Sequence, residues 1–200
     1  MRQLFILSPA KVSGVRARLL LNPKAPFATA KTFHRHGLPL GEVFSFASGL
    51  YFRGKLAYAR RFADARGDRI RVITTNRGLL DPDTLLRPAD LLAFGDVDID
   101  QTDSRYLHPL RNDADALARE LARGGQAILL GSIATGKYRD VLLSCFGKQL
   151  VFPQDFVGRG DMSRGGLLLR STREDRQLRY IAVEGAVFKG RRAPKISETG

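Results

Sequence analysis

The sequence is poor in cysteine, in long apolar runs and, relative to basic residues, in acidic ones. Its single cysteine, Cys145, excludes an internal disulfide and any metal site built from several cysteines. No apolar run approaches the roughly 18 to 20 residues that a membrane-spanning helix needs. The apolar run at residues 4–7 is too short for a secretory signal, and no small-residue cleavage site follows it. We therefore expect a cytoplasmic protein.

The acidic deficit leaves a large positive charge. The chain has 33 lysines and arginines against 20 acidic residues, which gives a net charge of +13. An excess of this size concerns partners rather than fold, and it makes nucleic acid the first candidate and an anionic membrane face the second. The 200 residues, 44% of them hydrophobic, suffice for one sizeable core. We predict a single domain over residues 1–185 and a basic, flexible tail over residues 186–200.

Short apolar segments alternate with amphipathic ones along the chain. The pattern predicts strands at residues 4–7, 70–74, 127–130 and 150–152. It predicts helices at residues 15–21, 54–65, 113–123 and 138–146, the third capped by Asn112, and irregular chain over residues 22–40. Residues 167–171 and 178–183 predict a C-terminal hairpin. This order favours an α/β fold with an open, mostly parallel sheet flanked by helices.

Four predicted loops follow the carboxyl ends of the strands. Ligands of open parallel sheets bind beyond those ends. We therefore expect the loops to converge on one pocket: residues 8–11, 75–81, 131–138 and 155–164.

The segment 151–170 has the densest concentration of chemically active side chains. Asp155, Asp161, Arg159, Arg164 and Ser163 lie among four glycines within a short stretch. Glycine lets a ligand approach the main chain closely, and loops on a rigid scaffold commonly carry function. The alternative is a solvated surface turn with ordinary ion pairs.

Residues 131–138, G-S-I-A-T-G-K-Y, contain the G-x-x-x-x-G-K part of a phosphate-binding loop. A glycine-rich turn into a helix presents N–H groups to an anion, and Lys137 adds a charge. Tyr138, however, stands where a Ser or Thr hydroxyl would hold magnesium. A simple anion site for a nucleic-acid phosphate therefore fits better than a nucleotide triphosphatase.

Other motifs favour ordinary structural roles. The spacing of Asp96, Asp98 and Asp100 resembles half of a calcium loop, but the required glycine and terminal glutamate are missing. His34 and His36 have no third ligand in sight. No G-x-S-x-G motif occurs, so serine-hydrolase chemistry of that type has no support. We expect no metal and no cofactor.

Aromatic residues between positions 44 and 58 interleave with Arg53 and Lys55. This mixture suits base stacking combined with phosphate contact. It suits a half-buried helix entrance equally well, and both interpretations stay open.

Several segments, in order, resemble the family of the peroxide-stress protein YaaA and its small bacterial and phage relatives. Residues 4–11, L-F-I-L-S-P-A-K, are similar to the start of that family. Residues 47–59, which include A-S-G-L and A-Y-A, and residues 74–83, T-T-N-R-G-L-L-D-P-D, resemble two further stretches. Residues 136–139, G-K-Y-R, resemble its G-x-x-Y-R.

The resemblance implies an α/β domain associated with DNA binding and protection, and with nucleobase chemistry among distant relatives. Two departures matter. Asn76 and Arg77 replace a lysine and its neighbour, and residues 160–164 are more charged than the glycine-rich loop of the relatives. Shared roles at those positions are therefore not implied.

The leading hypothesis is a DNA N-glycosylase that excises a modified or damaged base, in DNA repair or in defence against phage with modified DNA. The partner would be double-stranded DNA with an extruded base, and no membrane. Asp161 is the first candidate for the catalytic carboxylate and Asp155 the second, because a carboxylate stabilises an oxocarbenium-like transition state or activates water. Asn76 would read the base edge. Lys11 is an alternative amine nucleophile.

The remaining candidates would contact DNA. Tyr51 or Tyr138 would stack on the base, and the cations would hold phosphates. The predicted DNA-binding residues are Ser8, Lys11, Ser48, Tyr51, Arg53, Arg77, Lys137, Tyr138, Arg159, Ser163 and Arg164. A rival hypothesis is a non-catalytic DNA-binding stress protein, and a third is a nucleotide enzyme that uses residues 131–137. The sequence leaves the oligomeric state open.

Overall fold

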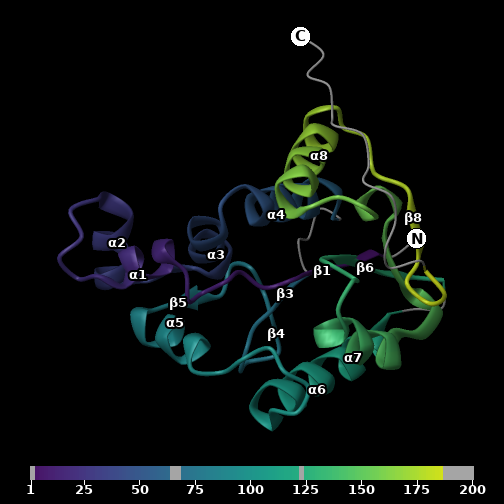
Figure 1. The fold of residues 1–200 in the computed structure, drawn as a ribbon, viewed down its shortest axis with the longest axis horizontal. Helices are drawn as coiled ribbons and strands as arrows, with labels where there is room; N and C mark the ends of the chain where they lie inside the picture. Colours follow the sequence, from purple (N-terminus) through teal and green to yellow (C-terminus); the bar gives the residue numbers. More distant parts are fainter. Residues whose placement is uncertain (1–2, 64–68, 122–123, 187–200) are drawn as a thin grey trace.

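The computed structural model describes residues 3–63, 69–121 and 124–186. They form an α/β domain around a six-stranded sheet with the strand order β4-β3-β1-β6-β7-β8 (Figure 1). The four central strands are mutually parallel, and an antiparallel strand lies at each edge. The sheet strands are β1 (Gln3–Leu7), β3 (Ile70–Ile73), β4 (Leu79–Leu80), β6 (Gln126–Leu130), β7 (Leu150–Pro153) and β8 (Tyr180–Ala182). The predicted α/β class and mostly parallel sheet are confirmed.

Helices cover both faces of the sheet. In Figure 1, α3, α4 and α8 lie above the strands and α6 and α7 below them. The helices are α1 (Val15–Leu21), α2 (Ala28–His36), α3 (Leu40–Ser48), α4 (Leu50–Phe62), α5 (Pro88–Gly95), α6 (Ser104–Glu120), α7 (Gly136–Phe146) and α8 (Asp161–Arg173). Short 3₁₀ turns, η1 (Gly147–Gln149) and η2 (Gln154–Phe156), flank β7, and a two-stranded ladder pairs β2 (Leu38–Pro39) with β5 (Leu85–Leu86).

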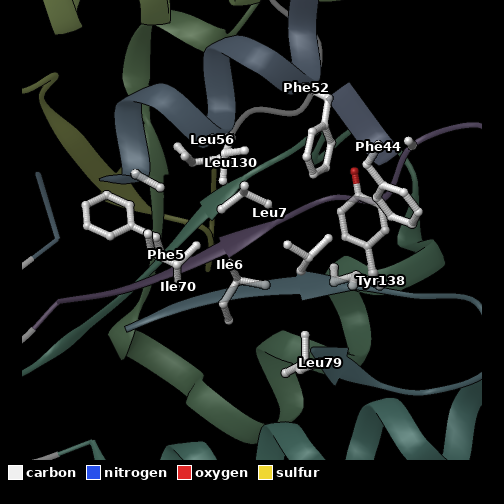
Figure 2. Packing of buried hydrophobic residues seen from close by; sticks show 14 of the residues in the cluster. Phe5, Ile6, Leu7, Phe44, Phe52, Leu56, Ile70, Leu79, Leu130 and Tyr138 are labelled. Atoms are coloured by element: carbon white, nitrogen blue, oxygen red, sulfur yellow. The ribbon is translucent and has the colours of Figure 1, made fainter. Parts of the chain in front are cut away.

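The central strand β1 is buried on both faces, as its unbroken run of apolar residues requires. Successive side chains of a strand point to opposite faces. Figure 2 shows Phe5 and Leu7 on the side of β1 that carries Leu56 of α4, and Ile6 on the other side. All three β1 side chains are completely buried. This sandwiching of β1 fixes where its carboxyl end, and hence Ser8, must lie.

The connections make the end of β1 a topological switch point. From β1 the chain passes through α1–α4 to β3 on one side, whereas β6 lies on the other side of β1 and leads through α7 to β7. Leu7 is in register with Val72 of β3 and with Leu130 of β6. Crevices of this kind, between strands whose connections run in opposite directions, are the usual ligand sites of open α/β sheets.

Several predicted elements differ from the structure. Residues 22–40, predicted to be irregular, contain α2 and lead into α3, and α4 begins at Leu50 rather than at residue 54. Asn112 does not cap the third predicted helix, because α6 starts at Ser104 with Asp103 as its cap, and Asp103 accepts a hydrogen bond from the Arg105 N–H at 2.9 Å. The predicted ends of two helices, at residues 65 and 123, lie outside the described residues.

The C-terminal part of the structure also differs from the prediction. Residues 167–171 belong to α8 rather than to a strand, and the C-terminal antiparallel pair is formed by β7 and β8. Residues 155–164, predicted to be a loop, are the end of η2, a short connection and the first turn of α8. The predicted tail falls almost entirely on residues 187–200, outside the described part of the chain. No helix in that described part has the length and apolarity to cross a membrane.

Candidate functional site

A pocket of about 440 Å³ opens at the switch point, beyond the carboxyl ends of β1, β3 and β6. Ser8 follows β1, Thr75 follows β3, and Ser132 follows β6. The remaining walls come from the start of α7, the start of α8, the end of α3, the first turn of α4 and the end of α5, together with the connecting residues 9–13 and 97–99. The convergence predicted from the sequence is therefore present, with α8 supplying the fourth side in place of a loop.

Half of the predicted site residues line this pocket. They are Ser8, Lys11, Ser48, Tyr51, Lys137, Tyr138 and Asp161. Lys11 and Lys137 are exposed at its rim, whereas the rings of Tyr51, Tyr138 and Phe94 are buried in its walls. The pocket thus joins apolar ring surfaces to two cations and to two carboxylates, those of Asp98 and Asp161.

Asp161 is the first residue of α8, where the helix dipole favours a negative charge. Its side chain is 70% exposed, and the Nη1 of Arg164 donates to Oδ1 at 3.5 Å, the long end of a hydrogen bond. This weak pairing leaves the carboxylate accessible from the pocket.

The other two predicted catalytic residues lie elsewhere. Asp155 is exposed in η2 and is not among the described residues that line the pocket. Asn76 also stands outside the lining, since its Nδ2 donates to the carbonyl oxygen of Ala93 at 2.8 Å. That bond ties the turn after β3 to α5, which gives Asn76 a structural role in this arrangement.

The predicted arginines are mostly engaged with their own surroundings. Arg53 lines a separate groove with residues of α1 and α3, and Arg77 pairs with Asp90 at 3.2 Å. Arg159 donates to Ser163 Oγ at 3.2 Å. The predicted site residues Arg53, Arg77, Arg159 and Ser163 are therefore outside the pocket lining.

Arg164 holds the start of α8 in place. Its Nε and Nη2 donate to the carbonyl oxygen of Phe156 at 3.2 and 3.1 Å, and its guanidinium lies 5.5 Å from the centre of the Phe156 ring. The side chain is only 12% exposed. Arg164 thus fixes the position of Asp161 rather than presenting a charge to solvent.

Lys55 is the functional candidate that sequence reasoning did not select. It lies on the buried face of α4 and is 1% exposed. Its Nζ donates to the carbonyl oxygen of Ser8 at 2.6 Å and to the Ser8 Oγ at 2.8 Å. The amine also lies 4.6 Å from the centre of the Tyr51 ring and 4.8 Å from that of Phe52. Fully buried lysines are rare in proteins, because burying an ammonium without strong compensation is costly.

Burial lowers the pKa of Lys55 to about 7, with the Asp161 carboxylate opposing the shift and the Arg164 guanidinium reinforcing it. Burial also raises the pKa of Tyr51 and of Tyr138. For Tyr138, hydrogen bonding with the Ser8 side chain and with the Ser132 backbone partly opposes that rise. Two tyrosines that stay neutral near neutral pH therefore line the pocket, and an amine that titrates near neutral pH lies behind Ser8.

A sequence signal for Lys55 did exist. In a helix, residues at i−4, i−3 and i+4 share a face with residue i. For Lys55 these are Tyr51, Phe52 and Ala59, all buried. A lysine in the middle of an apolar helical stripe is unusual and marks a candidate for a buried amine.

The described residues contain no group of three or more His, Cys, Asp or Glu side chains arranged to hold a metal ion. Comparisons of the chain with protein-family models, with curated proteins and with solved structures find no match.

Proposed function

We propose that this protein is a DNA N-glycosylase that excises a modified or damaged base. The observation that carries the proposal is the placement of Asp161, Lys11 and Lys137 around one pocket whose walls are aromatic. Its volume of about 440 Å³ suits a ligand of small-molecule size, which includes a nucleobase. The net charge of +13 supports a polyanionic partner. The resemblance to the YaaA family adds the expectation of DNA.

In this proposal each group has a separate task. Lys11 and Lys137, exposed at the rim, hold phosphates on either side of an extruded nucleotide. Tyr51, Tyr138 and Phe94 provide ring surfaces for the base. As the C1′–N bond breaks, the base leaves with the bonding electrons and positive charge develops on the sugar. The Asp161 carboxylate stabilises that charge or takes a proton from the attacking water.

The test is base release from synthetic duplexes that carry a panel of modified bases, followed by hot alkali to cut abasic sites. We expect wild type to cut at least one substrate. Asp161→Asn should bind the same duplex but release the base at least about a hundredfold more slowly. Asp155→Asn is the matched control, because it makes the same chemical change six residues away, outside the pocket lining. It should release the base at the wild-type rate.

Other outcomes decide against the proposal. Equal rates in Asp161→Asn and wild type would remove Asp161 from the mechanism. Tight, salt-sensitive binding without release from any duplex would favour a DNA-binding stress protein. Hydrolysis of free nucleotides that DNA does not affect would favour a nucleotide enzyme.

A further inference from the structure

Ser8 lies at the meeting point of three elements on the pocket floor. Its Oγ is 2.8 Å from the Nζ of Lys55, on α4, and its side chain also hydrogen-bonds with the Tyr138 hydroxyl, on α7. Its backbone N–H donates to the carbonyl oxygen of Leu130 at 3.1 Å, which fixes Ser8 to the end of β6. Ser8 lines the pocket, whereas Lys55 is behind it. Of these two residues, Ser8 is therefore the one that a ligand in the pocket can contact.

The neighbouring backbone is packed closely around this hydroxyl. A Cβ on Gly131 would lie 2.8 Å from the Ser8 Cβ, 2.9 Å from the Tyr138 Oη and 3.2 Å from the Ser8 Oγ. Glycine at this position is what allows the strand end to approach both side chains. The hydroxyl is consequently held in one place, as a reacting group must be.

We propose that Ser8 is a nucleophile activated by Lys55, and that this pair transfers an acyl group from an ester or amide substrate to water. The activity is separate from the proposed glycosylase and does not depend on it. Enzymes activate a serine by placing a base within hydrogen-bond reach of its hydroxyl and by orienting that base through further contacts. Here the Ser8 carbonyl oxygen and the rings of Tyr51 and Phe52 orient the amine.

The chemistry balances with the groups present. The neutral Lys55 amine takes the Ser8 Oγ proton while Oγ forms a bond to the carbonyl carbon of the substrate. The bond from that carbon to the leaving alcohol or amine then breaks, and the ammonium returns its proton to the leaving group. Water repeats the sequence on the acyl-serine, with Lys55 again taking and returning one proton, and the carboxylic acid leaves.

The surroundings of Lys55 favour its role as the base. Burial disfavours the ammonium more strongly than the Asp161 carboxylate favours it, and Arg164 adds repulsion, so the Lys55 amine loses its proton near neutral pH. The groups that face it are Ser8 at the end of β1, Tyr51 and Phe52 of α4, and Asp161 and Arg164 of α8. Lys11, by contrast, is exposed at the rim of the pocket.

An acyl substrate fits this site better than a sugar for reaction at Ser8. A serine bound to C1′ would be an acetal as hard to cleave as the substrate, whereas an acyl-serine is an ester that water can open. Tyr138 stays neutral and its hydroxyl is beside Ser8, so it is placed to donate a hydrogen bond to the oxyanion. The lining carries two lysines, Lys11 and Lys137, and two aspartates, Asp98 and Asp161, so its formal charges cancel and a neutral acyl compound is the expected substrate.

The experiment uses a fluorophosphonate, a phosphorus electrophile that captures activated serines, and intact-mass and peptide analysis of the product. We expect one adduct on Ser8. It should be absent in Ser8→Ala and form at least a hundredfold more slowly in Lys55→Met. Ser144→Ala and Lys148→Met should react at the wild-type rate, because both residues are exposed and outside the pocket lining. Hydrolysis of p-nitrophenyl esters should follow the same order.

The pH dependence of wild type provides a test that needs no variant to fold. With Lys55 as base, the labelling rate should rise through about pH 7 and then level off. An unassisted hydroxyl would instead gain about tenfold per pH unit up to pH 9. Three results would each overturn the proposal. They are a labelling rate that keeps rising up to pH 9, the absence of a Ser8 adduct, and equal labelling rates in folded Lys55→Met and wild type. Asp161→Asn should still be labelled on Ser8. A failure of the acyl-transfer proposal can therefore be distinguished from a failure of the glycosylase proposal.

Discussion

Gly54 of α4 and Gly165 of α8 touch where the two helices cross. A Cβ on Gly54 would lie 2.7 Å from the carbonyl oxygen of Gly165, and a Cβ on Gly165 would lie 2.9 Å from the Cα of Tyr51. Helices approach this closely only where side chains are absent. The contact brings Asp161 and Arg164, in the first turn of α8, close to Tyr51 and Lys55 on α4. The composition of the pocket therefore depends on this crossing.

The first prediction concerns that crossing. Gly165→Ala should destabilise the protein by about 1–3 kcal/mol, because the added methyl group must push the backbone of α4 away. Gly166→Ala is the control, since a Cβ there meets nothing within 4 Å. It should stabilise the helix by roughly 0.5–1 kcal/mol. Chemical denaturation of both variants measures the difference, and equal stabilities would contradict the close contact.

The second prediction concerns pH and Lys55. Its pKa in the folded protein is about 7, below the ordinary lysine value of about 10.4. Between these values the unfolded chain binds more protons than the folded one, so the free energy of unfolding should rise with pH. The slope approaches about 1.4 kcal/mol per pH unit for one proton.

Urea denaturation from pH 6 to pH 9.5 measures this slope. Lys55→Met should lose the rise, and Lys148→Met, which removes an exposed amine, should keep it. A rise of the same size in Lys55→Met would show that another group titrates.

The third prediction concerns DNA affinity. If Lys11 and Lys137 each contact one phosphate, replacing either by Gln should reduce the slope of log K against log salt by about 0.9. Lys148→Gln removes the same charge just before the amino end of β7, whereas the pocket lies beyond the carboxyl ends of the parallel strands. It should leave the slope unchanged. Fluorescence anisotropy across a salt series gives the slopes, and equal effects of all three variants would indicate nonspecific charge attraction.

The fourth prediction concerns Gly131. Gly131→Ala should displace the Ser8 and Tyr138 side chains, which lie within 3 Å of the new methyl position. Fluorophosphonate labelling of Ser8 should fall at least tenfold while the melting temperature shows that the protein remains folded. Gly160→Ala, at the N-cap of α8, meets nothing within 4 Å and should label normally. Undiminished labelling in Gly131→Ala would mean that the position of Ser8 is not critical.

Apolar periodicity was enough to predict the central sheet, because buried parallel strands are short runs of apolar residues. Prolines misled the prediction of residues 22–40. Pro39 is the N-cap of α3, and Pro26 precedes the first residue of α2 by two positions. These prolines therefore precede helices, where a missing N–H costs little, instead of marking irregular chain.

Glycine misled the prediction of residues 155–164 and beyond in a different way. The glycines of this segment favour a loop, yet Gly165 is helical and is needed for contact with α4. A glycine in the sequence shows that a side chain is absent, but it does not show whether the position forms a turn or a close contact between two helices. The helical spacing of Tyr51, Phe52 and Ala59 around Lys55 indicates an apolar face, but a lysine is normally solvated, and the three-dimensional packing is needed to show that this one is 1% exposed.

The helix α8 is held at its start and is packed closely against α4 through Gly165 and Gly54. At its start, Arg164 is bonded to Phe156. Beyond its end, the Tyr58 hydroxyl of α4 is 2.6 Å from that of Tyr180 in β8 and accepts from the Leu178 N–H at 2.8 Å. Such an element is a fixed wall and not a lid. The size of the ligand that the pocket admits is therefore set by the packing of the folded chain and not by a movement of α8.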